Sequence, residues 1–298
     1  MDILLPIHGK ATFLSETLKS IIPELSSRTN LIIVLDRAAP EVVSKVEAFG
    51  KTIGSRVRIY FSQEPGIVSA LNFGINQSNA DLIARIDCDD IMVKGRIVKQ
   101  REYFSQEPNL VALGGQCFFI NENSEPVRPF RSNNPKTHKF IKLQMYFRNP
   151  LAHPTVMFRR VKVAQAGYYR SEMTGLEDFD LWARLLTLGD VRNSHEEFIF
   201  YRISQNQSSR SIDNQINKHV IIVSTFSNWG AVRIKNFIEN STQIDAYILE
   251  LNAQSISKAT ITIVKMFILS PLISTIFVSY RLSSLFKCKI DETFRRSE

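Results

Sequence analysis

Apolar residues fall into short runs along the first ninety residues, and stretches with a different spacing separate them. Four apolar-rich runs predict strands, at 3–7, 31–35, 57–61 and 82–86. Three intervening stretches place apolar residues at helical spacing, at 13–22, 40–53 and 66–77. A continuous apolar run such as 31–35 is typical of a strand covered on both faces. The alternation predicts an α/β fold, in which a mostly parallel sheet is flanked by helices.

The pattern becomes less regular beyond residue 95. It predicts two helices, at 96–104 and 176–188, and two short strands, at 110–113 and 117–120. The helix at 176–188 has acidic residues in its first turn, where negative charge complements the helix dipole. Residues 121–139 are polar and rich in Asn, Pro and Arg, so a loop is expected there.

The last part of the chain is apolar and basic. Residues 261–286 are interrupted by Lys265, Pro271 and Arg281, and the uncharged stretch 266–280 is shorter than the roughly 20 residues that a transmembrane helix needs. Three arrangements remain open: a segment lying in the membrane interface, a helix packed on protein, or a membrane span. We therefore expect an α/β domain at 1–212 and a C-terminal helical extension at 213–298.

Composition and charge limit the cellular compartments and the classes of binding partner that are expected. Hydrophobic residues make up 44% of the chain and charged residues 22%, as in ordinary globular proteins. The three cysteines are scattered without a CxxC pair, which predicts a reducing compartment. The first residues lack the basic stretch of a secretory signal peptide, so we expect a cytoplasmic protein, either free or on the inner face of the membrane. The net charge of +8 comes from dispersed residues, and no nucleic-acid partner is expected.

Three carboxylates follow the strand predicted at 82–86. Asp87, Asp89 and Asp90 stand where that strand ends, and open α/β sheets bind ligands at the carboxyl ends of their strands. Asp87 and Asp89 are two residues apart, so an extended backbone would point both to the same side. Such a pair suits a cation like Mg²⁺, which takes one or two carboxylates together with substrate phosphates. An ordinary Asp-rich turn is the alternative.

The motifs of this chain resemble those of the inverting family 2 glycosyltransferases, of the bacterial cell-surface polysaccharide type, over roughly residues 2–210. Six segments carry the resemblance in the family's order: 4–7, 32–36, 66–75, 84–90, 96–100 and 177–185. The segment 84–90 reads ARIDCDD beside the family's ARLDSDD, and 177–185 reads EDFDLWARL beside EDYDLWLRL. The chain departs from the pattern at 37–39, at His8-Gly9 and at Lys94. The resemblance implies the GT-A fold.

The resemblance also implies a reaction and a set of roles. A sugar would pass from a nucleotide-diphosphate sugar to an acceptor hydroxyl, with inversion at the anomeric carbon. A divalent cation, Mn²⁺ or Mg²⁺, would bind Asp89 and Asp87 and offset the charge of the leaving diphosphate. Asp178 would be the catalytic base. Nucleotide-sugar binding would involve Pro6, His8, Asp36 and Asp87, and acceptor binding or positioning of the base would involve Glu177 and His153.

Two other functions fit parts of the pattern. A nucleotidyltransferase needs a glycine-rich phosphate loop near the N-terminus, and 8–10 contains a single glycine. A non-catalytic nucleotide-sugar-binding or assembly subunit would have no need to keep Asp87, Asp89 and Asp178 together. We therefore favour an enzyme whose acceptor is a saccharide or a lipid-linked saccharide, with a possible membrane contact through the C-terminal segment.

Several neighbouring residues have structural alternatives. Asp90 is expected to cap the following helix. Arg96 is expected either to meet phosphate or to pair with Asp90. Trp182 is expected in the core of its helix. A polar loop holding Arg202, Gln205 and Ser209 is expected to close over the diphosphate.

Overall fold

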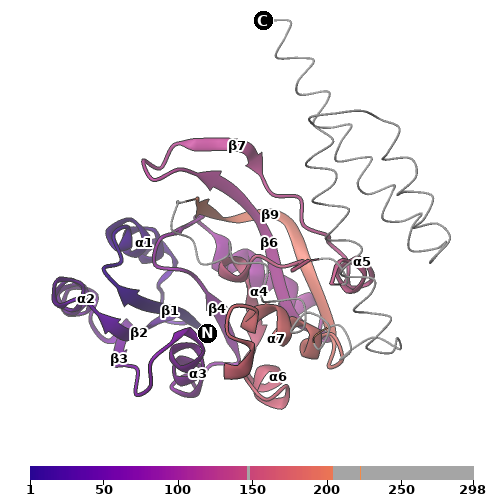
Figure 1. Ribbon diagram of the computed structural model, residues 1–298, viewed down its shortest axis with the longest axis horizontal. Coiled ribbons are helices and arrows are strands. Elements are labelled where there is room, and N and C mark those ends of the chain that lie inside the picture. Colours follow the sequence, from indigo (N-terminus) through magenta and orange to yellow (C-terminus); the bar gives the residue numbers. More distant parts are fainter. Residues whose placement is uncertain (146–147, 204–221, 223–298) are drawn as a thin grey trace, which may run out of the picture. The chain divides into compact units, whose positions relative to one another are not determined.

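The computed structural model describes residues 1–145, 148–203 and 222, and this part of the chain is built on one mixed sheet with helices against its faces (Figure 1). The strands are β1 (Asp2–Gly9), β2 (Asn30–Ala38), β3 (Val57–Phe61), β4 (Leu82–Arg85), β5 (Ile91–Met92), β6 (Leu110–Ile120), β7 (Pro126–Arg131), β8 (Met157–Arg159) and β9 (Asp190–Arg202). The helices are α1 (Leu14–Ile21), α2 (Pro40–Ile53), α3 (Ile67–Asn76), α4 (Arg96–Gln106), α5 (His138–Gln144), α6 (Arg160–Gln165) and α7 (Glu177–Leu185). The strand order is β3-β2-β1-β4-β8-β6-β9-β5, and β7 pairs with β6.

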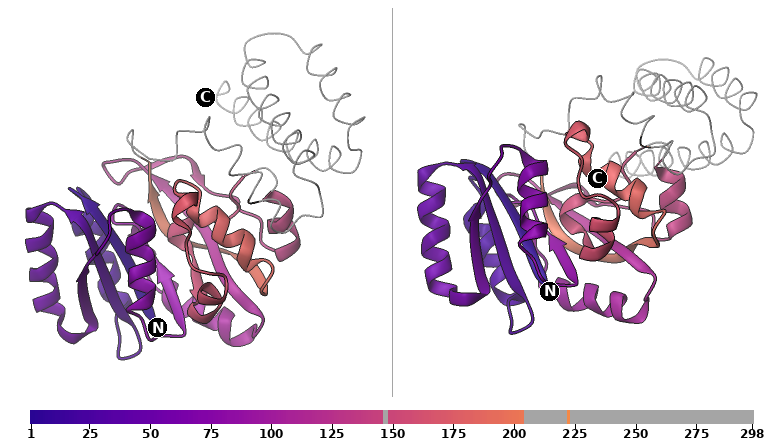
Figure 2. Two further views of the ribbon diagram at one scale, coloured as in Figure 1. Left: turned by 60° about the horizontal axis from the view of Figure 1, so that its bottom comes forward. Right: turned by 90° about the horizontal axis from the view of Figure 1, so that it is seen from below.

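The N-terminal half of the sheet agrees with the sequence prediction. β3, β2, β1 and β4 are parallel neighbours, and every strand and helix predicted before residue 86 is present. Helices cover both faces of these strands (Figure 2), and for that reason the apolar runs are continuous rather than alternating. Gly74 of α3 lies so close to β1 that a Cβ there would come 2.3 Å from Leu4 Cδ1. The carboxyl ends of these strands therefore meet along one edge of the sheet.

The C-terminal half of the sheet is mixed. β8 is antiparallel to β4 and β6, whereas β6 and β9 are parallel. The two strands predicted at 110–113 and 117–120 are in fact one strand, β6, which continues through Gly114 and Gly115. A Cβ on either glycine would come 2.3 Å from a side-chain atom of β9, so the two glycines mark a close backbone approach rather than a turn.

The prediction of a loop at 121–139 is wrong for part of this stretch, although 121–125 and 132–137 lie outside helices and strands. Within this stretch β7 pairs antiparallel with β6, and α5 begins at His138. In the described part of the chain β7 pairs with β6 alone, and proline is tolerated in a strand paired on one side. The α/β class itself is confirmed.

Arg96 is part of the core rather than of a phosphate site. It is 1% exposed and donates to Gln100 Oε1 at 2.9 Å, Pro154 O at 2.8 Å and Arg85 O at 2.9 Å. Gln100 in turn donates to Leu113 O at 3.0 Å. Both residues of the predicted 96–100 motif therefore fasten α4 to the centre of the sheet. Burial is the main reason why the pKa of the Arg96 guanidinium falls to about 9.

Some sequence predictions lie outside the described residues. These are the domain boundary after residue 212, the roles of Gln205 and Ser209, and the membrane contact of 261–286. Within the ranges that the structure describes, no helix is long and apolar enough to cross a membrane.

Candidate active site

One cavity of about 880 Å³ lies at the carboxyl ends of β1, β2 and β4 and extends to the start of α7. The side chains for which the sequence predicts catalysis, nucleotide-sugar binding, acceptor binding or metal binding line it: Pro6, His8, Asp36, Asp87, Asp89, His153, Glu177 and Asp178. They come from segments up to 172 positions apart in the chain, and parallel strands that end at one edge explain why the first five meet. The structure therefore groups the predicted residues without by itself assigning their roles.

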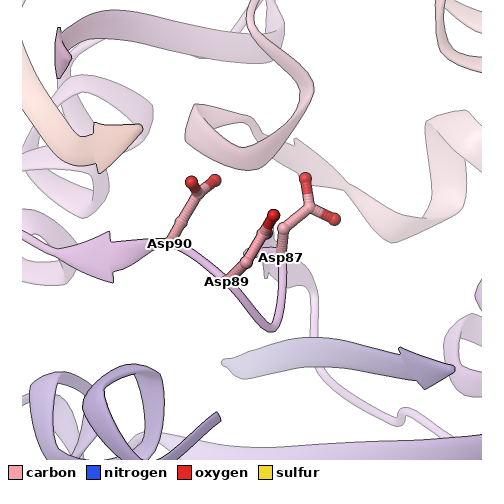
Figure 3. Close-up of side chains that lie close together, drawn as sticks. All are labelled: Asp87, Asp89 and Asp90. Atoms are coloured by element: carbon pink, nitrogen blue, oxygen red, sulfur yellow. The ribbon is translucent and has the colours of Figure 1, made fainter. Parts of the chain in front are cut away.

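An acidic turn follows β4 and carries Asp87, Asp89 and Asp90 (Figure 3). One carboxylate oxygen from each lies within 4.8 Å of the other two. The expected cause of this grouping is wrong, because β4 ends at Arg85 and the backbone turns rather than staying extended. The turn brings all three carboxylates together, whereas a regular strand would have turned Asp90 away from Asp87 and Asp89.

The acidic turn concentrates negative charge in a partly buried place. Burial and the charge of Asp87 raise the pKa of Asp89 to about 6, and burial together with the same neighbour raises the pKa of Asp90 well above its usual value. Arg85, which is 4% exposed, donates to both carboxylate oxygens of Asp87 and offsets one charge. A hard divalent cation fits the remaining oxygens, because it supplies the missing positive charge.

Arg202 holds the acidic turn in place. At the end of β9 it is 0% exposed; its Nε donates to Asp89 O at 2.9 Å and its backbone N–H to Asp90 Oδ1 at 2.9 Å. Its Nη2 lies 3.1 Å from Glu16 Oε2, and the guanidinium stacks 4.1 Å from the ring centroid of Phe13. The predicted place of Arg202 in a mobile loop over the diphosphate is therefore wrong.

Asp90 has no capping role. Its carboxylate accepts the backbone N–H of Arg202, and its carbonyl accepts the Thr17 hydroxyl at 2.7 Å. The cap position of α4 is Gly95, with φ +83°, so the expected cap is wrong. The predicted pairing with Arg96 fails as well, since the hydrogen bonds of that guanidinium go to Gln100 and to backbone carbonyls. Asp90 ties the acidic turn to α1 and β9.

Asp36 is fixed on the other side of the cavity, at the end of β2. It is 4% exposed, and its Oδ2 accepts the backbone N–H of Gly66 at 2.9 Å. His8 Nδ1 lies 3.2 Å from the same oxygen, and Arg37 Nε lies 3.3 Å from Oδ1. The His8 and Arg37 side chains are about two-thirds exposed, so this end of the cavity is open to a ligand. Pro6 of β1 lines it beside them.

Asp178 stands in the first turn of α7. Its Oδ2 accepts a 2.6 Å hydrogen bond from Asn149 Nδ2, and its Oδ1 accepts the backbone N–H of Phe179 at 2.7 Å. Burial, followed by the charge of Glu177, raises the pKa of Asp178 to about 6. Glu177 Oε2 accepts the N–H of Gly175 at 2.6 Å. A carboxylate with this pKa is ionised at neutral pH and can still accept a proton.

His153 lines the same cavity as Asp178. Its Nε2 is 2.8 Å from the Tyr169 hydroxyl, and its ring meets Trp182 edge to face with centroids 5.7 Å apart. Burial, followed by the charge of Arg85, lowers the pKa of His153 well below its usual value, so the ring is neutral. Trp182 is fully buried, which confirms the expectation for that residue.

Several residues that fix the positions of other side chains were missed by the sequence prediction or were given another role in it. Asn72 of α3 accepts the Tyr169 N–H at 3.0 Å and donates to its carbonyl at 2.8 Å, which explains the asparagine in the predicted 66–75 motif. Asn149 and Arg202 act across 29 and 113 positions of sequence. Nothing in the local pattern points to such distant partners. A motif match did mark Asn72, although it gave no reason.

Comparison with known proteins gives the class of the chain. The sequence profile of Glycosyl transferase family 2 matches residues 2–167, which is more than half of the chain, and the chain belongs to this family. It is therefore a glycosyltransferase, as the sequence motifs predicted.

Particular relatives and structures refine this picture. The chain is 29% identical to the Escherichia coli O-antigen biosynthesis glycosyltransferase WbnJ, over 71% of this chain and 82% of that protein. It is 26% identical to the Escherichia coli UDP-Gal:alpha-D-GlcNAc-diphosphoundecaprenol beta-1,3-galactosyltransferase, over 70% and 76%.

Among solved structures, S. aureus TarS 1–349 in complex with UDP-GlcNAc aligns with a TM-score of 0.62 at 11% identity, covering 88% of this chain and 78% of that one. The mannosyltransferase PcManGT from Pyrobaculum calidifontis, in complex with GDP-Man and Mn²⁺, aligns with a TM-score of 0.57 at 11% identity, covering 96% and 87%. The predicted GT-A fold is confirmed.

Proposed function

We propose that this glycosyltransferase transfers a sugar, with inversion, from a nucleotide-diphosphate donor to an acceptor hydroxyl in the synthesis of a cell-surface polysaccharide or lipid-linked oligosaccharide. The observation that carries the proposal is that Asp87 and Asp89 of the acidic turn line the same cavity as Asp178 of α7. Carboxylates that could bind a cation and a carboxylate that could accept a proton therefore lie in one cavity.

The acidic turn is the donor end of this cavity. Asp89 and Asp87 would hold a divalent cation, which offsets the charge that grows on the leaving diphosphate. Arg85 orients the Asp87 carboxylate through hydrogen bonds, and Arg202 holds the backbone carbonyl of Asp89. Asp36 would accept a hydrogen bond from the nucleobase, in the open end of the cavity beside Pro6 and His8.

Asp178 is the base at the acceptor end. Inversion by a single displacement needs the acceptor hydroxyl to attack from the face opposite the leaving diphosphate, and to lose its proton as it does so. Asp178 would take that proton, a contribution of about 10²–10⁴-fold to rate. Glu177 and His153 lie beside it and would contact the acceptor or hold the base.

The names of relatives support the choice of substrates. UDP-GlcNAc is bound in the aligned TarS structure, and GDP-Man with Mn²⁺ in the aligned mannosyltransferase. One relative is named for a diphosphoundecaprenol-linked acceptor. We infer a nucleotide sugar as donor and a saccharide, free or lipid-linked, as acceptor.

A donor screen tests this proposal. Purified protein is incubated with UDP-, GDP- and dTDP-sugars, a saccharide acceptor and Mn²⁺ or Mg²⁺, and release of nucleoside diphosphate and formation of the glycoside are followed. We expect release from one donor, lost on adding EDTA, and a product whose anomeric configuration, measured by NMR, is opposite to the donor's. Retention of configuration would contradict inversion. No binding of any nucleotide sugar would contradict the proposed function.

A further inference from the structure

We propose that Asn149 is a positioning residue for the reaction, because its side-chain amide fixes the orientation and the basicity of the Asp178 carboxylate. This inference deepens the proposed function and rests on it as far as Asp178 is the base. Asn149 lies just before the 153–155 turn and lines the cavity beside Asp178. No sequence motif marked it.

The orientation of the Asn149 amide is determined by its own contacts. Its Oδ1 accepts the backbone N–H of Leu151 at 3.2 Å, so its Nδ2 is the end that faces α7. That Nδ2 donates to Asp178 Oδ2 at 2.6 Å. An amide flipped about its Cβ–Cγ bond would lose both hydrogen bonds and place two oxygens against each other.

Asp178 is therefore gripped at both oxygens. Asn149 holds Oδ2, and the backbone N–H of Phe179 holds Oδ1 at 2.7 Å. Two donors on one carboxylate restrict its rotation and leave it one remaining lone pair on each oxygen for an acceptor hydroxyl. An amide that donates to a carboxylate also favours its charged form.

The charged groups around Asp178 act in opposite directions. Glu177 on α7 disfavours the ionised carboxylate, and Arg85 on β4 favours it. Tyr169 and His153 on the same wall are neutral at physiological pH, because burial raises the pKa of the tyrosine and lowers that of the histidine. Among the residues that the structure describes, Asn149 and the Phe179 N–H are the two groups that donate hydrogen bonds to Asp178, and both favour its ionised form.

The substitution Asn149→Asp removes this hydrogen-bond donor while keeping the shape of the side chain. It keeps the volume and the oxygen that accepts from Leu151, and it replaces the donor to Asp178 with a second carboxylate. Asn149→Ala removes the donor without adding charge. Asn134→Asp is the matched control, since Asn134 lines the same cavity but its Nδ2 donates to Gly115 O instead.

The titration of Asp178 is measured directly, by ¹³C NMR of protein labelled at the aspartate carboxyl carbons. The Asp178 signal is assigned by its loss in Asp178→Asn. We expect the midpoint to rise by about 0.5–1 pH unit in Asn149→Ala, for one lost hydrogen bond, and by more than one unit in Asn149→Asp. The rise in Asn134→Asp should be smaller than in Asn149→Asp.

The pH profile of kcat/KM gives the functional readout. Its acid limb should move upward in the same order as the NMR midpoints, while KM for the donor stays within about twofold. Unchanged midpoints in both Asn149 variants would overturn the inference, as would equal rises in Asn149→Asp and Asn134→Asp. Because the NMR titration needs no substrate, absence of turnover in the wild-type protein would contradict the proposed function and leave the contact between Asn149 and Asp178 separately tested.

Discussion

As the proposed base, Asp178 must be deprotonated to accept the proton of an acceptor hydroxyl, and burial raises its pKa to about 6. The sign of the resulting pH dependence is fixed. Below pH 6 the carboxyl is protonated and the base is lost; above it the base is ionised. We predict that kcat/KM falls about tenfold for each pH unit below 6 and levels off above pH 7.

The variant Asp178→Asn should lose about 10²–10⁴-fold in kcat and should also lose the acid limb from its residual activity. Glu177→Gln is the matched control at the preceding position of α7. Removing its charge should lower the midpoint of the acid limb, because Glu177 disfavours ionisation of Asp178. An acid limb that survives unchanged in Asp178→Asn would show that another group titrates.

At the scale of single elements, the acidic turn depends on a residue far away in the chain. The Arg202 Nε donates to the backbone carbonyl of Asp89, and its Nη2 donates to Glu16 of α1. The Arg202 backbone N–H donates to the Asp90 carboxylate. Lysine has one compact ammonium and cannot make this set of contacts. We predict that Arg202→Lys raises the Mn²⁺ concentration for half-maximal activity by about 10-fold, as is typical for residues that support metal ligands.

The control for this prediction is Arg131→Lys on β7, whose guanidinium pairs with Glu197 away from the turn. It should leave the Mn²⁺ dependence unchanged. Thermal melts confirm that both variants are folded. An Arg202→Lys protein that is folded, and has the wild-type Mn²⁺ dependence, would show that the turn holds its shape without this contact.

The helix α7, which presents Asp178, is anchored by a buried ion cluster. Asp180 is 0% exposed and accepts hydrogen bonds from both Arg170 and Arg184. Removing one partner of a buried pair leaves charge without compensation. We predict that Asp180→Asn lowers the free energy of unfolding by about 3 kcal/mol, measured by urea denaturation.

Glu172→Gln is a fair comparison, because Glu172 Oε1 lies 3.9 Å from the same Arg170 but its side chain is 63% exposed. It should change the free energy of unfolding by less than about 1 kcal/mol. Equal effects of the two substitutions would show that burial of Asp180 adds nothing to the anchoring of α7.

At the scale of the whole molecule, local pattern and motif order predicted much of the fold and the members of the site. The buried strand at 31–35 and the carboxylates at 87–90 could be predicted from the local sequence. The residues that act together in each of them are also adjacent in the chain. β7 and the uninterrupted β6 were missed, because their pairing depends on packing between distant strands, where Gly114 and Gly115 permit close contact.

The same limit applies to the site. Asn149 and Arg202 were missed or misplaced, since their partners Asp178 and Asp89 lie 29 and 113 positions away. A single sequence shows where the carboxylates are. It does not show which distant asparagine or arginine will donate hydrogen bonds to them and fix their orientation. Arg96 and Gln100 show the opposite case, because both match a family motif and both are buried in the core rather than placed in the site.

The apolar and basic stretch at 261–286 also concerns the whole molecule, and its membrane contact remains a prediction from the sequence. We expect the full chain to sediment with vesicles that contain phosphatidylglycerol, and a chain ending at residue 254 to stay in the supernatant. Failure of the intact chain to bind such vesicles would contradict this part of the account.

We propose that the two ends of one cavity have different roles: the acidic turn binds the donor through a cation, and Asp178 accepts the proton of the acceptor. The most direct test measures donor binding and nucleoside diphosphate release side by side, in the wild-type protein, Asp89→Asn and Asp178→Asn, with Mn²⁺ and with EDTA. Asp89→Asn and EDTA should weaken both metal-dependent donor binding and release. Asp178→Asn should bind donor as the wild type does and lose transfer to the acceptor by at least 100-fold. A protein in which Asp178→Asn transfers sugar at the wild-type rate, or in which Asp89→Asn retains its Mn²⁺ dependence, would contradict the account.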